Sequence, residues 1–158
     1  MEKTENLLKQ LLERGDCPCD NSIIYANGEI DYIGFSNGKP SILGKSSIDD
    51  YFGSELEAWF VTTCSCETDS YRICGGEGSY GADGILYIID KHTNEPLWFL
   101  FLDFVNPIER IEVEGGVIKA YNNNRGLLLV SITDPIINLR FIKNSDRKEE
   151  NPDNQYDK

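Results

Sequence analysis

The sequence predicts a mainly β fold, an antiparallel meander that forms a twisted sheet or a sandwich, with one short N-terminal helix packed on it. Asn27-Gly28 and Asn37-Gly38 each separate short runs rich in β-branched and aromatic residues, a strong local signal of a hairpin. Between Ile85 and Ile132, short apolar or alternating runs follow one another with glycine- and asparagine-rich turns between them. Near the N-terminus, leucines spaced three and four apart predict the helix.

The helix is the first element of the chain. Its apolar stripe consists of Leu7, Leu8, Leu11 and Leu12. Thr4 is its expected N-cap, and Gly15 is expected to end it. A helix this short is stable only when it docks on another element, so we expect it to pack on the sheet.

The strands follow from Ser22 onward. After the two hairpins, we expect a helical turn at Ile48–Phe52 and then a strand over Glu57–Cys66. The run Leu97–Leu102 is apolar at consecutive positions, which is typical of a strand buried on both faces. We therefore place it at the centre of the sheet. The run from Ile108 to Gly115 alternates apolar and charged residues, as half-buried strands do.

The chain of 158 residues is long enough for one domain with a substantial core. We assign residues 1–143 to a single β-rich domain and residues 144–158, which are polar and without periodicity, to a disordered acidic tail. The first residues lack the apolar segment of a signal peptide, and no apolar run is as long as a membrane span. The sequence thus predicts a cytoplasmic protein whose five cysteines are reduced thiols.

The charge is strongly negative. Lys and Arg number 15 against 27 Asp and Glu, for a net charge of −12. A surface of this sign repels nucleic acid and anionic membranes, so we expect neither as a partner. It steers the protein toward basic partners, most often other proteins.

Gly76 to Gly81 spell G-x-G-x-x-G, a pattern known from nucleotide-binding loops. A dinucleotide-binding fingerprint needs a helix after the motif, whereas the residues that follow here are strand-like. The stretch also resembles the glycine-rich loop of protein kinases over seven residues, but Asp83 stands at the position of the kinase valine and no His-Arg-Asp motif follows. We interpret the stretch as a flexible loop between strands.

The cysteines form two close pairs, Cys17/Cys19 and Cys64/Cys66, with Cys74 apart. One interpretation is a small zinc- or ligand-binding β domain that uses these pairs, because residues two apart on a strand share a face. The other is that the thiols are packed as small hydrophobic groups. A catalytic thiol would need a base, and the only histidine, His92, lies in a predicted turn. We therefore predict a protein that is not an enzyme, with no catalytic residues, no metal ligands and no cofactor.

Acidic residues and tyrosines gather in the stretch from Cys66 to Gly84. Carboxylates accelerate the encounter with a basic partner, and aromatic rings often supply the largest binding contributions. We expect this stretch to be the partner-facing end of a hairpin. The predicted contacts are Glu67, Asp69, Glu77, Tyr80 and Asp83.

In its size, its charge, its docked N-terminal helix and its lack of catalytic residues, the chain resembles the immunity proteins that bacteria make against polymorphic or contact-dependent toxins. The resemblance implies a cognate toxin domain, commonly a nuclease with a basic surface, that is blocked by one-to-one binding. Carboxylates can imitate the charge of the phosphates that such an active site binds.

Overall fold

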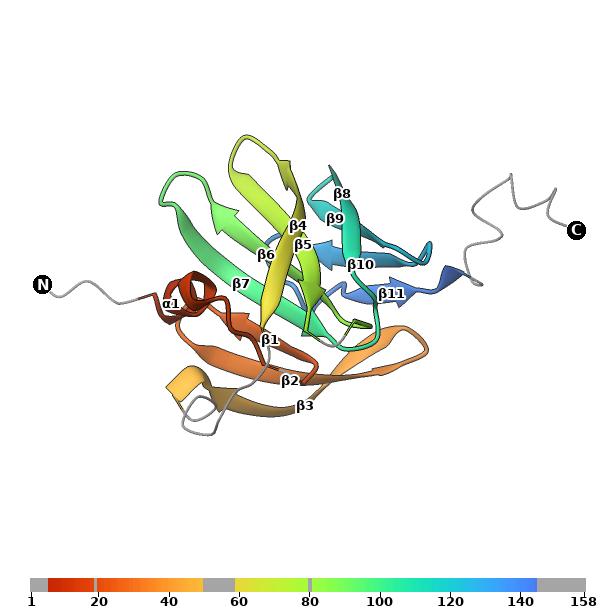
Figure 1. Ribbon diagram of the computed structural model, residues 1–158, viewed down its shortest axis with the longest axis horizontal. Helices are drawn as coiled ribbons and strands as arrows, with labels where there is room; N and C mark the ends of the chain where they lie inside the picture. The colour runs from red at the N-terminus through yellow and green to blue at the C-terminus, as the bar shows by residue number, and fades with distance from the viewer. Residues whose placement is uncertain (1–5, 19, 50–58, 80, 145–158) are drawn as a thin grey trace, which may run out of the picture.

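The structure is a computed structural model that describes residues 6–18, 20–49, 59–79 and 81–144. Within these residues it contains one helix and eleven strands (Figure 1). The elements are α1 (Leu7–Arg14), β1 (Ser22–Tyr25), β2 (Glu29–Ser36), β3 (Lys39–Ser47), β4 (Phe60–Glu67), β5 (Tyr71–Gly78), β6 (Gly84–Asp90), β7 (Glu95–Leu102), β8 (Ile108–Glu114), β9 (Val117–Asn122), β10 (Leu127–Ser131) and β11 (Arg140–Ile142). The predicted mainly β fold with one short helix is confirmed.

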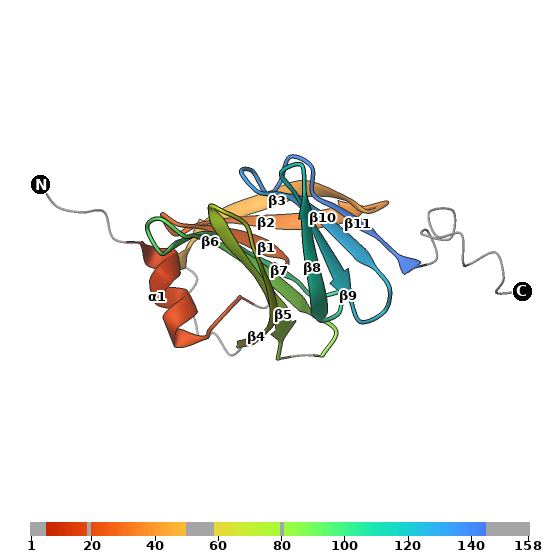
Figure 2. The same ribbon diagram turned by 90° about the horizontal axis from the view of Figure 1, so that it is seen from above.

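The described strands form two antiparallel sheets. The larger sheet has seven strands in the order β3-β2-β1-β7-β6-β5-β4, and the smaller sheet has four in the order β11-β10-β9-β8. Figure 2 shows α1 and the smaller sheet on opposite sides of the larger sheet. The molecule is thus a two-sheet sandwich with a helix on its outer face.

Helix α1 has a side-chain cap at its start and a glycine at its end, and only the second of these residues was predicted correctly. Its N-cap is Asn6, whose side chain accepts a hydrogen bond from the Lys9 amide at 2.9 Å, so the prediction of Thr4 as the cap was wrong. Gly15 ends the helix in the left-handed conformation, at φ 74°, as expected. Leu8 and Leu11 lie on the inner face of the helix and are buried, which confirms the docking of the helix on the sheet.

Both Asn-Gly hairpins are present. Gly28 and Gly38 have φ values of 91° and 77°, and Asn37 is also left-handed at 55°. These conformations suit the tight turns between β1 and β2 and between β2 and β3. The signal in the sequence was therefore sufficient to place both turns.

Strand β7 lies at the centre of the larger sheet, as predicted, and it is buried on both faces. Trp98, Leu100 and Leu102 face the smaller sheet. Phe99 and Phe101 face the cluster beneath α1. The Trp98 indole also donates a buried hydrogen bond of 2.9 Å to the carbonyl of Ile132, which ties the central strand to the end of the smaller sheet.

The predicted meander is divided between the two sheets. After β7 the chain leaves the larger sheet, and β8 to β11 form the smaller one. The edges of the two sheets meet at the carbonyl of Ile108, which accepts a hydrogen bond of 2.9 Å from the Thr63 hydroxyl and one of 3.5 Å from the Cys64 thiol. Of the two predicted arrangements, the sandwich is the one that forms.

The interpretation of Gly76 to Gly81 as a flexible loop was wrong for its first three residues, which lie in a strand, whereas Ser79 and Gly81 lie in the turn that follows. Residues Tyr71–Gly78 form β5, which pairs with β4 on one side and β6 on the other. A Cβ atom on Gly75 would lie 2.8 Å from a methyl group of Ile108, and one on Gly76 would lie 1.9 Å from the carbonyl oxygen of Val61. The glycines are needed for close packing, not for mobility.

Three predictions fall wholly or partly outside the described residues. Of the expected helical turn Ile48–Phe52, only Ile48 and Asp49 are described, and both are helical. Of the expected strand Glu57–Cys66, the described part begins as β4 at Phe60 and ends one residue later than expected, at Glu67. The expected tail lies outside the described residues beyond Asn144.

Candidate binding surfaces

Carboxylates gather at one end of the larger sheet, where the chain turns between its strands. We call this set the acidic rim; it consists of Glu29, Asp49, Glu67, Asp69, Asp90 and Glu95. The strand register brings the rim together, because Asp90 pairs with both Tyr71 and Glu95, and Glu29 pairs with Ser47. The first four carboxylates are exposed and the last two are half-buried.

The cations beside the rim offset only part of its charge. Arg72 and Lys91 both pair with Glu67, at 3.3 Å and 3.8 Å. Among the residues that the structure describes, the other five carboxylates of the rim form no ion pair. The rim is therefore a negative surface whose carboxylates are available to a cationic partner.

The structure separates the five predicted contact residues. Glu67 and Asp69 belong to the acidic rim, whereas Glu77 and Asp83 lie at the opposite end of β5 and β6. The five positions from Arg72 to Glu77 span roughly 17 Å of strand. Tyr80 lies outside the described residues. These residues were grouped because they are neighbours in sequence, and the strand between them divides the group.

The prediction that Asp83 contacts a partner was also wrong for a second reason. Its side chain is buried, with 0% exposure, and cannot lie on a partner-facing surface. Its carboxylate accepts a hydrogen bond of 3.1 Å from the amide of Gly78 and closes the turn between β5 and β6. Next to it, the amide of Asn106 donates to the carbonyl of Ala82 at 2.8 Å. The role of Asp83 in the structure is to hold this corner of the sandwich together.

We expect Asp83→Ala to lower the free energy of unfolding by about 1–3 kcal/mol, since it leaves the buried Gly78 amide without an acceptor. Asp83→Asn keeps an acceptor oxygen and should cost less. Urea denaturation of the two variants and the wild type checks this order. If Asp83→Ala were as stable as the wild type, the carboxylate would have no structural role.

The described cysteines of the two pairs do not form a common site. Cys17 is buried with Leu8 and Leu11 on the face that α1 covers. Cys64 and Cys66 share a face, as expected for alternate strand residues, but they pack against the core between the two sheets. The larger sheet thus separates Cys17 from the second pair, and Cys19 lies outside the described residues. Within the described part of the chain, no group of three or more His, Cys, Asp or Glu residues is placed to hold a metal ion.

The thiols and the histidine are poorly placed for nucleophilic chemistry. Burial raises the pKa of the Cys64 thiol, and burial likewise raises the pKa of Cys74. Each thiol is therefore more fully protonated at neutral pH than a free cysteine, which weakens it as a nucleophile. His92 lies exposed in the β6–β7 turn, where its amide donates to the Asp90 carboxylate at 2.8 Å.

A groove of about 1100 Å³ lies at the end of the sandwich remote from the rim. Its lining comes from the β2–β3 turn, the β7–β8 connection, the β9–β10 turn and the last residues described. The lining contains three phenylalanines, six asparagines and two cationic residues, Arg140 and Lys143. In the part of the chain that the structure describes, no aspartate or glutamate lines it. We call it the asparagine groove.

Sequence reasoning missed most of both surfaces. Glu29, Asp90 and Glu95 each flank a turn between two predicted strands, so their position at strand ends could have been inferred. No comparable local pattern in the sequence indicated the asparagine groove. Its phenylalanines, Phe35, Phe104 and Phe141, lie far apart in sequence, and only the packing of the two sheets brings them together.

The chain matches no family model and no curated protein sequence.

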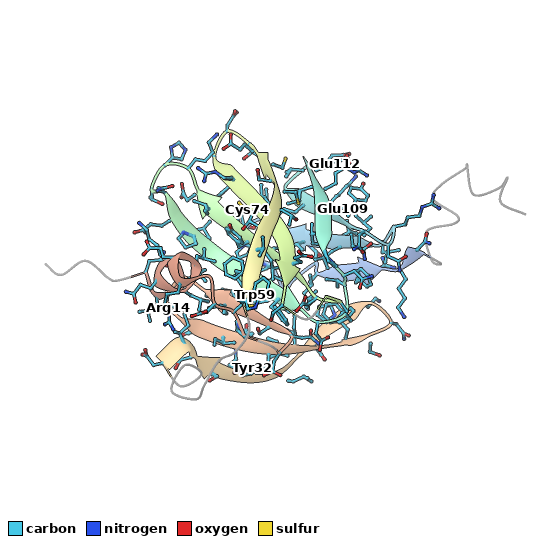
Figure 3. The ribbon with its side chains drawn as sticks, in the orientation of Figure 1. Arg14, Tyr32, Trp59, Cys74, Glu109 and Glu112 are labelled. Atoms are coloured by element: carbon cyan, nitrogen blue, oxygen red, sulfur yellow. The ribbon has the colours of Figure 1, made fainter. Side chains whose placement is uncertain are left out.

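Figure 3 shows that the labelled carboxylates of Glu109 and Glu112 lie on β8, well away from Arg14 on α1. In the described residues, no helix has the length and apolar character needed to cross a membrane.

Proposed function

We propose that this protein is an immunity protein that binds and neutralises a cognate toxin domain by one-to-one association. The observation that carries the proposal is the acidic rim, with six carboxylates on one end of a rigid sheet and only Glu67 among them in an ion pair within the described residues. A nuclease toxin must bind phosphate groups, so its active site is positively charged. The rim presents negative charge of the kind that such a site attracts.

The dimensions of the rim suit this role. Seven strands spaced about 4.8 Å apart give the sheet end a width of roughly 29 Å. A stable protein–protein interface buries about 800 Å² on each partner, which a surface of this width can supply. Because five of the six rim carboxylates lie at hairpin turns between paired strands, little ordering of these residues is needed when a partner binds.

The chemistry of the described residues supports binding without catalysis. The Cys64 and Cys74 thiols have raised pKa values because they are buried, and His92 is an exposed turn residue. Neither arrangement provides an activated nucleophile with a base beside it. The proposal therefore assigns the inhibition to occupation of the toxin surface and not to modification of the toxin.

We expect the double substitution Glu29→Lys and Asp69→Lys to slow association with the toxin domain at least tenfold at low salt, because charge complementarity mainly sets the association rate. The proposal predicts that a gene for a large secreted protein lies immediately upstream of this one, and the C-terminal domain of that protein is the partner to use; a metabolic operon at this place would contradict the proposal. The association rate is measured by surface plasmon resonance at two salt concentrations. The variant should also show a weaker dependence of that rate on salt.

A matched control is Asp103→Lys, which makes the same charge change per site. Asp103 is exposed and directly follows β7, whose first residue, Glu95, belongs to the rim. The eight positions between these two residues correspond to roughly 26 Å. The single variants Glu29→Lys and Asp69→Lys are measured beside the control. If Asp103→Lys slowed association as much as either of them, the rim would not be the contact surface.

A further inference from the structure

The asparagine groove has an aromatic wall with one accessible ring. Phe104 is 37% exposed and lies between Phe35 and Phe141, with ring centroids 5.1 Å and 5.6 Å away. Both neighbours meet it edge to face, at interplanar angles of 69° and 77°. The wall holds the Phe104 ring in place and leaves part of it open to the groove. A flat aromatic ligand can stack on such a ring.

Five of the six asparagines that line the groove fall into two groups. Asn21 and Asn122 are used internally, since Asn21 accepts from the Asp103 amide at 2.7 Å, and Asn122 donates to the Val105 carbonyl at 2.5 Å and accepts from the Gly126 amide at 2.6 Å. Among the described residues, the side-chain amides of Asn37, Asn106 and Asn124 form no hydrogen bond. Each carries a donor and an acceptor in one plane, which matches the edge of a nucleobase or a pair of sugar hydroxyls.

The charge of the groove is opposite to that of the chain. The protein carries a net charge of −12, yet the groove is lined by Arg140 and Lys143 and by no described carboxylate. Both cationic residues are exposed, and neither forms an ion pair among the described residues. An anionic group is therefore attracted to this end of the molecule and repelled by the rim at the other end.

We propose that the asparagine groove binds a nucleoside phosphate. The base would stack on Phe104, the asparagine amides would bind the base edge and the ribose hydroxyls, and Arg140 and Lys143 would bind the phosphates. The volume, about 1100 Å³, is slightly above the usual range for small-molecule sites and has room for a nucleoside triphosphate. This inference is independent of the proposed function, because the groove and the rim are at opposite ends of the sandwich. The negative rim still disfavours a long nucleic acid.

The test is isothermal titration calorimetry of the full-length protein with ATP, GTP, CTP and UTP separately. We expect at least one of them to bind with a dissociation constant below about 1 mM. The corresponding nucleoside, without phosphate, should bind about tenfold more weakly, since it loses charge-assisted hydrogen bonds. Inorganic tripolyphosphate should also bind more weakly, since it lacks the base.

Variants locate the site. Lys143→Glu combined with Arg140→Glu should weaken binding at least tenfold, and Phe104→Ala should weaken it severalfold. The two charge reversals are at exposed positions, so they test the site even if Phe104→Ala is unstable. Lys9→Glu on α1, at the other end of the molecule, is the matched control and should bind like the wild type (Figure 1). The proposal is overturned if no triphosphate binds, if tripolyphosphate binds as well as the nucleotide, or if the groove variants bind like the control.

Discussion

Gly76→Ala is expected to lower the free energy of unfolding by about 3 kcal/mol, because β5 has no room for one more carbon atom at this position. The added Cβ would lie 1.9 Å from the Val61 carbonyl oxygen and 3.0 Å from the Cα atom of Thr62. Both are backbone atoms of β4, so the strand itself would have to move. The register between β4 and β5 is already irregular between Thr62 and Cys64, which leaves little freedom for a further shift.

The measurement for Gly76→Ala is urea denaturation followed by circular dichroism. Gly44→Ala is the matched control, since Gly44 also lies in a strand, β3, but an added Cβ would have nothing within 4 Å. The control should be as stable as the wild type or slightly more stable, because alanine restricts the unfolded chain. Equal stability of the two variants would mean that Gly76 lies in a loop, as its sequence context alone predicts.

Phe99→Ala is expected to cost about 3–5 kcal/mol, which is the usual range for removing a buried phenylalanine. Phe99 lies in the central strand β7 and has 0% exposure. Its ring contacts Phe60 and Tyr87, with centroid separations of 5.0 Å and 5.9 Å. The same cluster contains Leu8 and Leu11 of α1, so a cavity here also removes the surface on which the helix docks.

Leu43→Ala is the control for Phe99→Ala, because Leu43 lies on the edge strand β3 and is 72% exposed. Its loss should change the free energy of unfolding by less than about 0.5 kcal/mol. A loss of stability for Phe99→Ala as small as that of the control would contradict the placement of β7 at the centre of the sheet.

The features that could be predicted from the sequence are those with local signals. The Asn-Gly pairs determined two hairpins, since only a few residues adopt left-handed conformations at low cost. The run Leu97–Leu102 identified the central strand because apolar residues at consecutive positions need a partner on both faces. The leucine stripe and Gly15 located the helix, although its N-cap is Asn6 and not Thr4.

The features that could not be predicted depend on contacts between distant segments. Glycine is rare in strands, so Gly75, Gly76 and Gly78 favoured a loop, and only pairing with β4 and β6 explains their place in a sheet. The same error placed Glu67 and Glu77 on one surface. The groove is formed where the β2–β3 turn meets β11, and the amide of Phe141 donates to the Gly38 carbonyl at 3.0 Å, a contact across about a hundred residues.

The most direct test of the proposed function is growth of cells that express a candidate toxin domain, the C-terminal domain of the large secreted protein that the proposal predicts to be encoded beside this protein. Three strains are compared, which carry the toxin domain with the wild-type protein, with the Glu29→Lys and Asp69→Lys double variant, or with the Asp103→Lys control. We predict that the wild type and the control restore growth and that the double variant restores it less at equal expression. Arrested growth in the presence of the wild-type protein, or full rescue by the double variant, would contradict neutralisation through the acidic rim.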